Sequence, residues 1–195
     1  MAKVMLSEKE LEQLYDAEWI LSKNRIMEKI SILFGDLAEE WRSNFKLKQS
    51  LIDSSSFRHP KISKGEQYQQ LPWMILDYPR EIARSDIFLV RCFFWWGKYF
   101  AIILHMEGSY QKKYSHQFQR QLHHKGWHLY IGADKWDNLF NTKNYTSTWT
   151  QTDIESRSFL KWIYLIPFNG LEIVEEEIKV AYQQLLDCLC SESME

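Results

Sequence analysis

Two polar side chains interrupt the most apolar stretch of the chain, residues 86–107. Arg91 and His105 stand among runs of aliphatic and aromatic residues, so each must either be buried with a partner or line a cavity. A buried guanidinium without a counter-charge is very costly, and this predicts a carboxylate beside Arg91. The nearest candidates along the sequence are Asp77, Glu81 and Asp86.

A second group of reactive residue types lies just upstream, in the segment Asp77–Glu81 (DYPRE). It places a carboxylate, a phenol and a guanidinium at the expected end of a strand, where binding sites are often built. Arg80 or Arg91 could hold an anionic group, and a histidine could act as a general base; the alternative is a structural salt-bridge network. The predicted ligand-binding residues are Asp77, Tyr78, Arg80, Arg91, His105 and His128.

Motifs of the common enzyme classes are absent from the sequence. There is no HExxH, no pair of CxxC motifs, no Walker A loop, no GxGxxG after a strand and no GxSxG elbow. The histidines at 123, 124 and 128, followed by Asp134 and Asp137, do not match a known spacing of zinc ligands. We therefore predict no catalytic residue, no metal ligand and no cofactor.

A basic, histidine-containing segment spans Lys112–Lys125, and no Asp or Glu occurs between Glu107 and Asp134. If the segment is helical, its cations lie on one face beside an aromatic stripe, which is typical of a surface that contacts phosphates. The same pattern also fits the solvated face of an ordinary amphipathic helix. The formal net charge of −2 argues against nucleic acid as the main partner, so this segment is an alternative.

The elements that must position these residues begin with a hairpin over 86–107. Gly97-Lys98 at its centre predicts a two-residue type II′ turn, because Gly supplies the positive φ of the first turn position. That turn sets a register in which adjacent rungs point to opposite faces, so Arg91 and His105 are expected on different faces. The expected pairs include Trp96 with Tyr99, Arg91 with Leu104, and Val90 with His105.

Periodicity along the rest of the chain predicts an α+β fold with an N-terminal helical pair, a central antiparallel sheet of about five or six strands and a C-terminal helix packed on the sheet. Gly35 is expected to end the first helix of the pair as a left-handed residue. The stretch 53–70 lacks periodicity and is expected to be a surface loop or a flap over a site. The predicted ranges are 1–52 for the helical pair, 53–70 for the loop, 71–168 for the sheet region, 169–190 for the C-terminal helix and 191–195 for a tail, all within a single domain, 1–195.

The amino-acid composition indicates the class of protein and favours one functional hypothesis. A hydrophobic fraction of 45% fits a globular chain, whereas an aromatic fraction of 15%, with 9 Trp, is high and is typical of core, pocket walls or partner surfaces. The hypothesis we favour is a non-enzymatic domain that binds a small ligand or a protein partner in an aromatic-lined groove. A hydrolase or transferase of unfamiliar type, and nucleic-acid binding through residues 112–125, are the alternatives.

The sequence also leads to expectations about cellular location and oligomeric state. Three cysteines form no disulfide framework, and residues 1–10 do not resemble a secretory signal, so we expect a cytoplasmic protein. Arg91 and Lys98 would lie inside any span built from 86–107, which argues against a membrane segment. A long N-terminal helix or an apolar edge strand could form a homodimer.

Overall fold

The computed structural model describes residues 4–47 and 57–190. In that part of the chain, an antiparallel sheet of seven strands has the order β1-β2-β3-β4-β7-β5-β6. The α+β prediction is confirmed, with more strands than expected. The elements are α1 (Glu8–Tyr15), α2 (Ala17–Leu47), β1 (Lys61–Tyr68), β2 (Leu71–Ile82), β3 (Ile87–Trp95), β4 (Tyr99–Glu107), α3 (Ser109–Leu122), β5 (Trp127–Tyr130), β6 (Tyr145–Thr146), α4 (Gln151–Glu155), β7 (Phe159–Ile166) and α5 (Leu171–Cys190).

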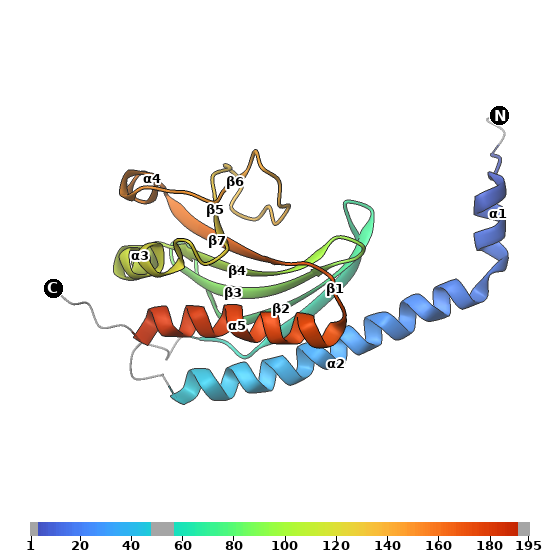
Figure 1. The fold of residues 1–195 in the computed structure, drawn as a ribbon, viewed down its shortest axis with the longest axis horizontal. Coiled ribbons are helices and arrows are strands. Elements are labelled where there is room, and N and C mark those ends of the chain that lie inside the picture. Colours follow the sequence, from blue (N-terminus) through green and yellow to red (C-terminus); the bar gives the residue numbers. More distant parts are fainter. Residues whose placement is uncertain (1–3, 48–56, 191–195) are drawn as a thin grey trace.

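The two faces of the sheet are covered differently. Helices α2 and α5 lie along one face, and the connection between β5 and β6 lies over the other (Figure 1). We call residues 131–144 of that connection the covering loop. The helical face holds the larger core, and the face under the covering loop holds a second, smaller cluster of buried side chains. The sheet is therefore buried on both sides, as the apolar hairpin predicted.

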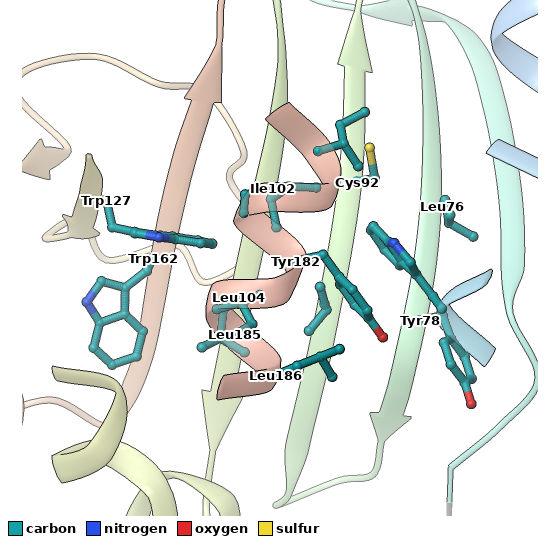
Figure 2. Close-up of a cluster of buried hydrophobic side chains, with 14 of the residues drawn as sticks. Leu76, Tyr78, Cys92, Ile102, Leu104, Trp127, Trp162, Tyr182, Leu185 and Leu186 are labelled. Carbon is teal, nitrogen blue, oxygen red and sulfur yellow. The ribbon is translucent and has the colours of Figure 1, made fainter. Parts of the chain in front are cut away.

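The larger core forms where α5 lies across the strands. Figure 2 shows Ile102 and Leu104 of β4 beside α5, with Leu76 of β2 farther to the side. Tyr182 of α5 stacks on Trp41 of α2 with ring centroids 4.0 Å apart, which joins the two helices directly. Burial of large aromatic side chains is the main source of stability of this layer.

The break in the N-terminal helices lies at Asp16, and the prediction of a break at Gly35 is wrong. Gly35 lies inside α2, which continues from Ala17 to Leu47. The buried side chains of Phe34 and Trp41 on either side of the glycine hold the helix against the sheet, and this packing outweighs the weak helix propensity of Gly. Residues 1–3 and 48–52 of the predicted pair lie outside the described residues.

The prediction of a loop over 53–70 is wrong for Lys61–Tyr68, which forms the edge strand β1. This strand pairs with β2, with Lys61 opposite Asp77. Its residues are mostly exposed and polar, because an edge strand gains its backbone hydrogen bonds from one neighbour and needs little apolar surface. Apolar alternation, the usual signal, is therefore weak; residues 53–56 lie outside the described part of the chain.

The register predicted for the β3–β4 hairpin is wrong by one residue. The turn has three residues, Trp96–Lys98, and the N–H of Lys98 donates to the carbonyl of Trp95 at 3.1 Å. In the four-residue turn Trp95–Lys98 that this hydrogen bond closes, Gly97 is the third residue and has a φ of +66°, the sign that a type II turn requires there. Arg91 consequently pairs with Ile103, and His105 pairs with Leu89. Because Leu89 and Arg91 are two residues apart, Arg91 and His105 lie on the same face.

Candidate functional site

Four polar side chains gather on the face beneath the covering loop. Asp77 pairs with Arg91 across β2 and β3, and His105 pairs with Lys161 across β4 and β7. Paired residues point to the same side of a sheet, so all four share one face with the apolar cluster around Phe93. We call Asp77, Arg91, His105 and Lys161 the buried polar group.

Asp77 and Arg91 form a bidentate ion pair. Nε of Arg91 donates to Oδ1 of Asp77 at 2.7 Å, and Nη2 donates to Oδ2 at 2.9 Å. Both side chains are largely buried. Asp77 is thus the carboxylate that the sequence required beside Arg91, and this fork geometry is the strongest arrangement for such a pair. The Nε/Nη2 edge of the guanidinium, one of the two edges that can bind an anion through two hydrogen bonds, is occupied by the protein's own carboxylate.

Lys161 ties the covering loop to the sheet. Its side chain is 1% exposed, and Nζ donates to the backbone carbonyls of Lys135, at 3.1 Å, and Asp137. The same nitrogen lies 4.1 Å from the ring centroid of Tyr130, a cation–π contact. Burial lowers the pKa of Lys161 to about 8, although the carboxylates of Asp137 and Asp134 act in the opposite direction.

His105 is enclosed by aromatic rings. It is 2% exposed, and its ring centroid lies 5.3 Å from that of Trp136 and 5.7 Å from that of Phe159. Its Nε2 atom has no hydrogen-bond partner among the described residues. Burial lowers the pKa of His105 to about 3, and the positive charge of Lys161 adds to the effect. An imidazole with such a pKa is neutral near pH 7 and is a weak general base.

Tyrosine hydroxyls hold the covering loop at its centre. The hydroxyl of Tyr99 donates to the carbonyl of Asn138 at 3.2 Å and accepts from the N–H of Phe140 at 3.0 Å. Burial is the main reason that the pKa of Tyr99 rises to about 12. At the end of β4, Glu107 forms an ion pair with Lys135 of the loop at 2.6 Å. The polar residues of this face therefore act together to fasten the loop.

The six residues predicted as a site do not all come together. Asp77, Arg91 and His105 lie on the covered face, together with His128, whose ring contacts Phe140 at 5.1 Å and whose pKa is lowered by burial. Tyr78 points to the helical side, where it packs against Phe45 at 5.9 Å. Arg80 donates from Nε to the carbonyl of His59 at 2.8 Å.

Lys161 was missed by the sequence reasoning, although the signal was present. It is the one charged residue in the apolar run FLKWIYLI of β7, just as Arg91 is in β3. A charged side chain in a strand that is apolar on both faces indicates a buried, partnered group. The same test that selected Arg91 would have selected Lys161.

An aromatic groove lies at the turn between β3 and β4. It is a cavity of about 370 Å³ between this turn, α2 and the segment that precedes α5. Lys98 sits at the turn with Nζ 5.7 Å from the ring centroid of Trp95, and Phe168 is exposed on the opposite side. The groove is lined by Ile26, Phe94, Trp95, Trp96, Gly97, Lys98, Tyr99 and Phe168.

The basic segment forms a separate cavity of about 350 Å³ between α3 and the start of α4. His116, Arg120 and His123 line it, together with Trp149, whose ring centroid lies 4.9 Å from that of His123. Within the described residues, Nε1 of Trp149 is buried without a hydrogen-bond partner. This arrangement combines one cation, Arg120, with an aromatic side chain, but Trp149 is buried.

Comparison of the chain with protein-family models, with curated protein sequences and with solved structures finds no match. In residues 4–47 and 57–190, no group of three His, Cys, Asp or Glu side chains is arranged to hold a metal ion. None of the helices within those ranges combines the length and apolar character needed to cross a bilayer. The geometry of the two cavities and of the buried polar group is therefore the basis for any functional proposal.

Proposed function

We propose that this protein is a non-enzymatic binding domain whose aromatic groove holds a small ligand with a flat apolar body and an anionic group. The observation that carries the proposal is the groove itself, where aromatic side chains from β3, β4 and the segment before α5 surround a cavity of about 370 Å³. Ligand pockets typically measure about 300–1,000 Å³ and combine apolar walls with a few polar groups. Lys98 is the cation in this lining, and it favours a ligand that carries a carboxylate or a similar anion.

The buried polar group supports binding over catalysis. Arg91 forms an ion pair with Asp77, and Lys161 donates hydrogen bonds to two backbone carbonyls of the covering loop. His105 lies beneath the covering loop with its pKa far below neutrality, so it does not offer a base to a substrate. For these residues to act on the substrate of a hydrolase or transferase, the covering loop would have to move away from them. The enzyme alternative therefore has less support than the groove.

Ligand-observed NMR with a set of aromatic carboxylates tests this proposal. We expect binders to lose their saturation-transfer signal in the Trp96→Ala variant, because the variant removes a wall of the groove. Lys98→Gln should lower the affinity for carboxylates by roughly tenfold or more, because charge-assisted hydrogen bonds contribute about 1.5–3 kcal/mol. The affinity for neutral amide analogues should not change.

Trp136→Ala is the matched control, since Trp136 is an exposed tryptophan on the covering loop, outside the groove lining. Binding that survives Trp96→Ala but is lost in Trp136→Ala would place the ligand under the covering loop and overturn the proposal. The absence of any binder from a set that includes indole, naphthalene and phenyl carboxylates would also count against it.

Nucleic-acid binding through residues 112–125 is a second candidate, favoured by Arg120, which lines the same cavity as Trp149. Binding of a fluorescent single-stranded oligonucleotide should then fall steeply with salt, because phosphate contacts release counterions. Arg120→Glu should abolish it, whereas Lys98→Glu, outside α3, should leave it unchanged. Salt-independent binding, or none, removes this candidate.

A further inference from the structure

The N-terminal part of the chain projects from the body and is apolar. Helix α1 and the beginning of α2 extend past the sheet, away from the other helices (Figure 1). We call residues 4–21 the arm. Tyr15 is 84% exposed, Leu14 67% and Trp19 49%, and α1 has no buried residue. The large apolar side chains of the arm that are exposed are Val4, Met5, Leu6, Leu11, Leu14, Tyr15, Trp19, Ile20 and Leu21.

Such an arm is not expected to stand alone in water. Helix α1 has only eight residues, and isolated helices shorter than about 12–15 residues are marginal. Its capping box, in which Ser7 and Glu10 bond each other's backbone, stabilises the first turn only locally. The apolar patch is also larger than the few isolated residues that a monomer normally exposes. The arm therefore needs a surface to cover it.

The charges of the arm and of the neighbouring turns of α2 identify that surface. Between Ser7 and Glu18 the sequence has five carboxylates and one lysine, whereas between Trp19 and Lys29 it has three basic residues and one carboxylate. Two copies lying antiparallel place the acidic half of each beside the basic half of the other. A parallel arrangement would instead place like charges together.

Two basic residues of this region already have partners within the chain: the pair of Arg25 is exposed, whereas the side chain of Lys23 is largely buried and keeps its partner. Arg25 lies 3.2 Å from Glu18, and Lys23 forms an ion pair with Glu66. The Arg25–Glu18 pair is exposed on both sides, so it contributes little and can be exchanged for an equivalent contact at small cost. It also joins the acidic and basic halves of the same helix, as the antiparallel arrangement would between copies.

We propose that the arms of two copies pack antiparallel about a two-fold axis and form a homodimer. This contact is closed and self-complementary, as in most soluble dimers. The nine exposed apolar side chains of the arm supply an area on the order of the 800 Å² that each partner buries in a standard interface. The inference does not depend on the ligand groove, because it uses the arm and not the turn between β3 and β4.

Sedimentation equilibrium on the full chain is the first test. We expect wild-type protein at about 100 µM to sediment at twice the chain mass of 23.6 kDa. The double variant Leu14→Glu with Trp19→Glu should sediment as a monomer and keep the helical circular dichroism of the body. Val180→Glu, which places the same charge on an exposed site of α5, is the matched control and should remain dimeric.

Charge exchange tests the antiparallel arrangement itself. The variants Glu12→Lys with Glu18→Lys, and Arg25→Glu with Lys29→Glu, should each be largely monomeric, because each places like charges across the interface. An equimolar mixture should recover the dimer. Wild-type protein that is monomeric at about 100 µM, or a dimer that survives the arm substitutions, overturns the proposal. Co-sedimentation of that monomer with anionic phospholipid vesicles would assign the arm to a membrane surface instead.

Discussion

At the scale of single residues, the buried polar group determines how the covered face is closed. Polar atoms in a sheet interior are costly unless they are paired; here Asp77 and Arg91 join two strands, whereas other polar contacts connect the strands to the covering loop. Lys161 reaches two loop carbonyls, and Glu107 binds Lys135 of the loop. The cost of burying these charges is thus offset by an ordered covering over an otherwise apolar face.

The ion pair of Asp77 with Arg91 should be sensitive to the loss of one partner. Asp77→Leu or Arg91→Leu alone should lower the free energy of unfolding by about 3–5 kcal/mol, because each leaves a buried charge without its partner. The double variant should lose less than the sum of the two. Urea unfolding followed by circular dichroism measures all three values.

Arg42→Leu is the matched control for this cycle. Arg42 bridges Glu39 at 2.7 Å, but both side chains are exposed, so the expected loss is below about 1 kcal/mol. Losses of that small size for Asp77→Leu and Arg91→Leu as well would mean that water reaches the pair beneath the covering loop.

His105 predicts a specific dependence of stability on pH. The folded chain holds its pKa at about 3, whereas the ordinary value is 6.5, so only the unfolded chain binds this proton between those values. The free energy of unfolding should therefore fall as pH decreases from about 6.5 toward 3, with a contribution of about 1.4 kcal/mol per pH unit from this group. Urea titrations at several pH values should show a shallower dependence for His105→Leu.

His116→Leu removes an exposed imidazole on α3 and should retain the wild-type pH dependence. If the curves for wild type and His105→Leu run parallel over this range, then His105 is accessible to protons in the folded state and the covering loop opens readily.

At the scale of elements, the local sequence signal agrees with the structure at one glycine and disagrees at another. Gly35 and Gly97 both looked like turn residues in the sequence, but only Gly97 has positive φ and lies in a turn. Helix α2 runs through Gly35 because its apolar stripe is buried on both sides of that residue. The prediction therefore ended a helix at Gly35, whereas tertiary contacts continue the helix through this residue.

Alanine substitution distinguishes these two glycines. Gly35→Ala should raise the free energy of unfolding by about 0.5–1 kcal/mol, because a Cβ there meets nothing within 4 Å and alanine is the better helix former. Gly97→Ala also meets no atom within 4 Å but should lower it by about 1–2 kcal/mol, because φ is +66°. Thermal unfolding of the two variants measures both signs, and destabilisation by Gly35→Ala would mean that α2 is bent at this residue.

At the scale of the whole molecule, the body and the arm are separable. The body buries its apolar residues between the helices, the sheet and the covering loop, whereas α1 buries none. An amphipathic helix whose apolar side chains add nothing to its own core is more consistent with assembly than with folding of the single chain. The groove adjoins this region through Ile26 of α2.

Deletion of residues 1–15 should leave the fold intact. It keeps Asp16, which accepts from the N–H of Trp19 at 3.3 Å and caps α2. In dilute solution, where chains are monomeric, we expect Tm to shift by less than about 2–4 °C, the change that 1 kcal/mol produces in a chain of this size. Differential scanning fluorimetry measures the shift.

Leu185→Ala provides the contrast for this deletion, because Leu185 is buried between α5 and the sheet and its truncation should cost about 2–5 kcal/mol. A deletion that destabilises the chain as much as Leu185→Ala would mean that α1 packs on the body in solution.

Much of the fold could be predicted from the sequence, but little of the site could. The strand pair β3–β4, helix α5 and the need for a carboxylate beside Arg91 all follow from residue types and their local spacing. The edge strand β1 could not be predicted, because its hydrogen bonds come from β2 and leave no apolar pattern. An aromatic-lined groove was expected from the composition, but the residues that line it could not be predicted, because they come from three separate segments of the chain.

The sequence by itself determined that Arg91 needs a partner if it is buried, because an isolated charge among apolar neighbours is costly whatever the fold; it left open whether Arg91 is paired in this way or lines a cavity. Only the tertiary structure decided which face Arg91 and His105 share. One additional residue in the turn at Trp96–Lys98 shifts every pair of the β3–β4 ladder and reverses that assignment. The stability of a register comes from contacts between residues distant along the chain, and local spacing does not contain those contacts.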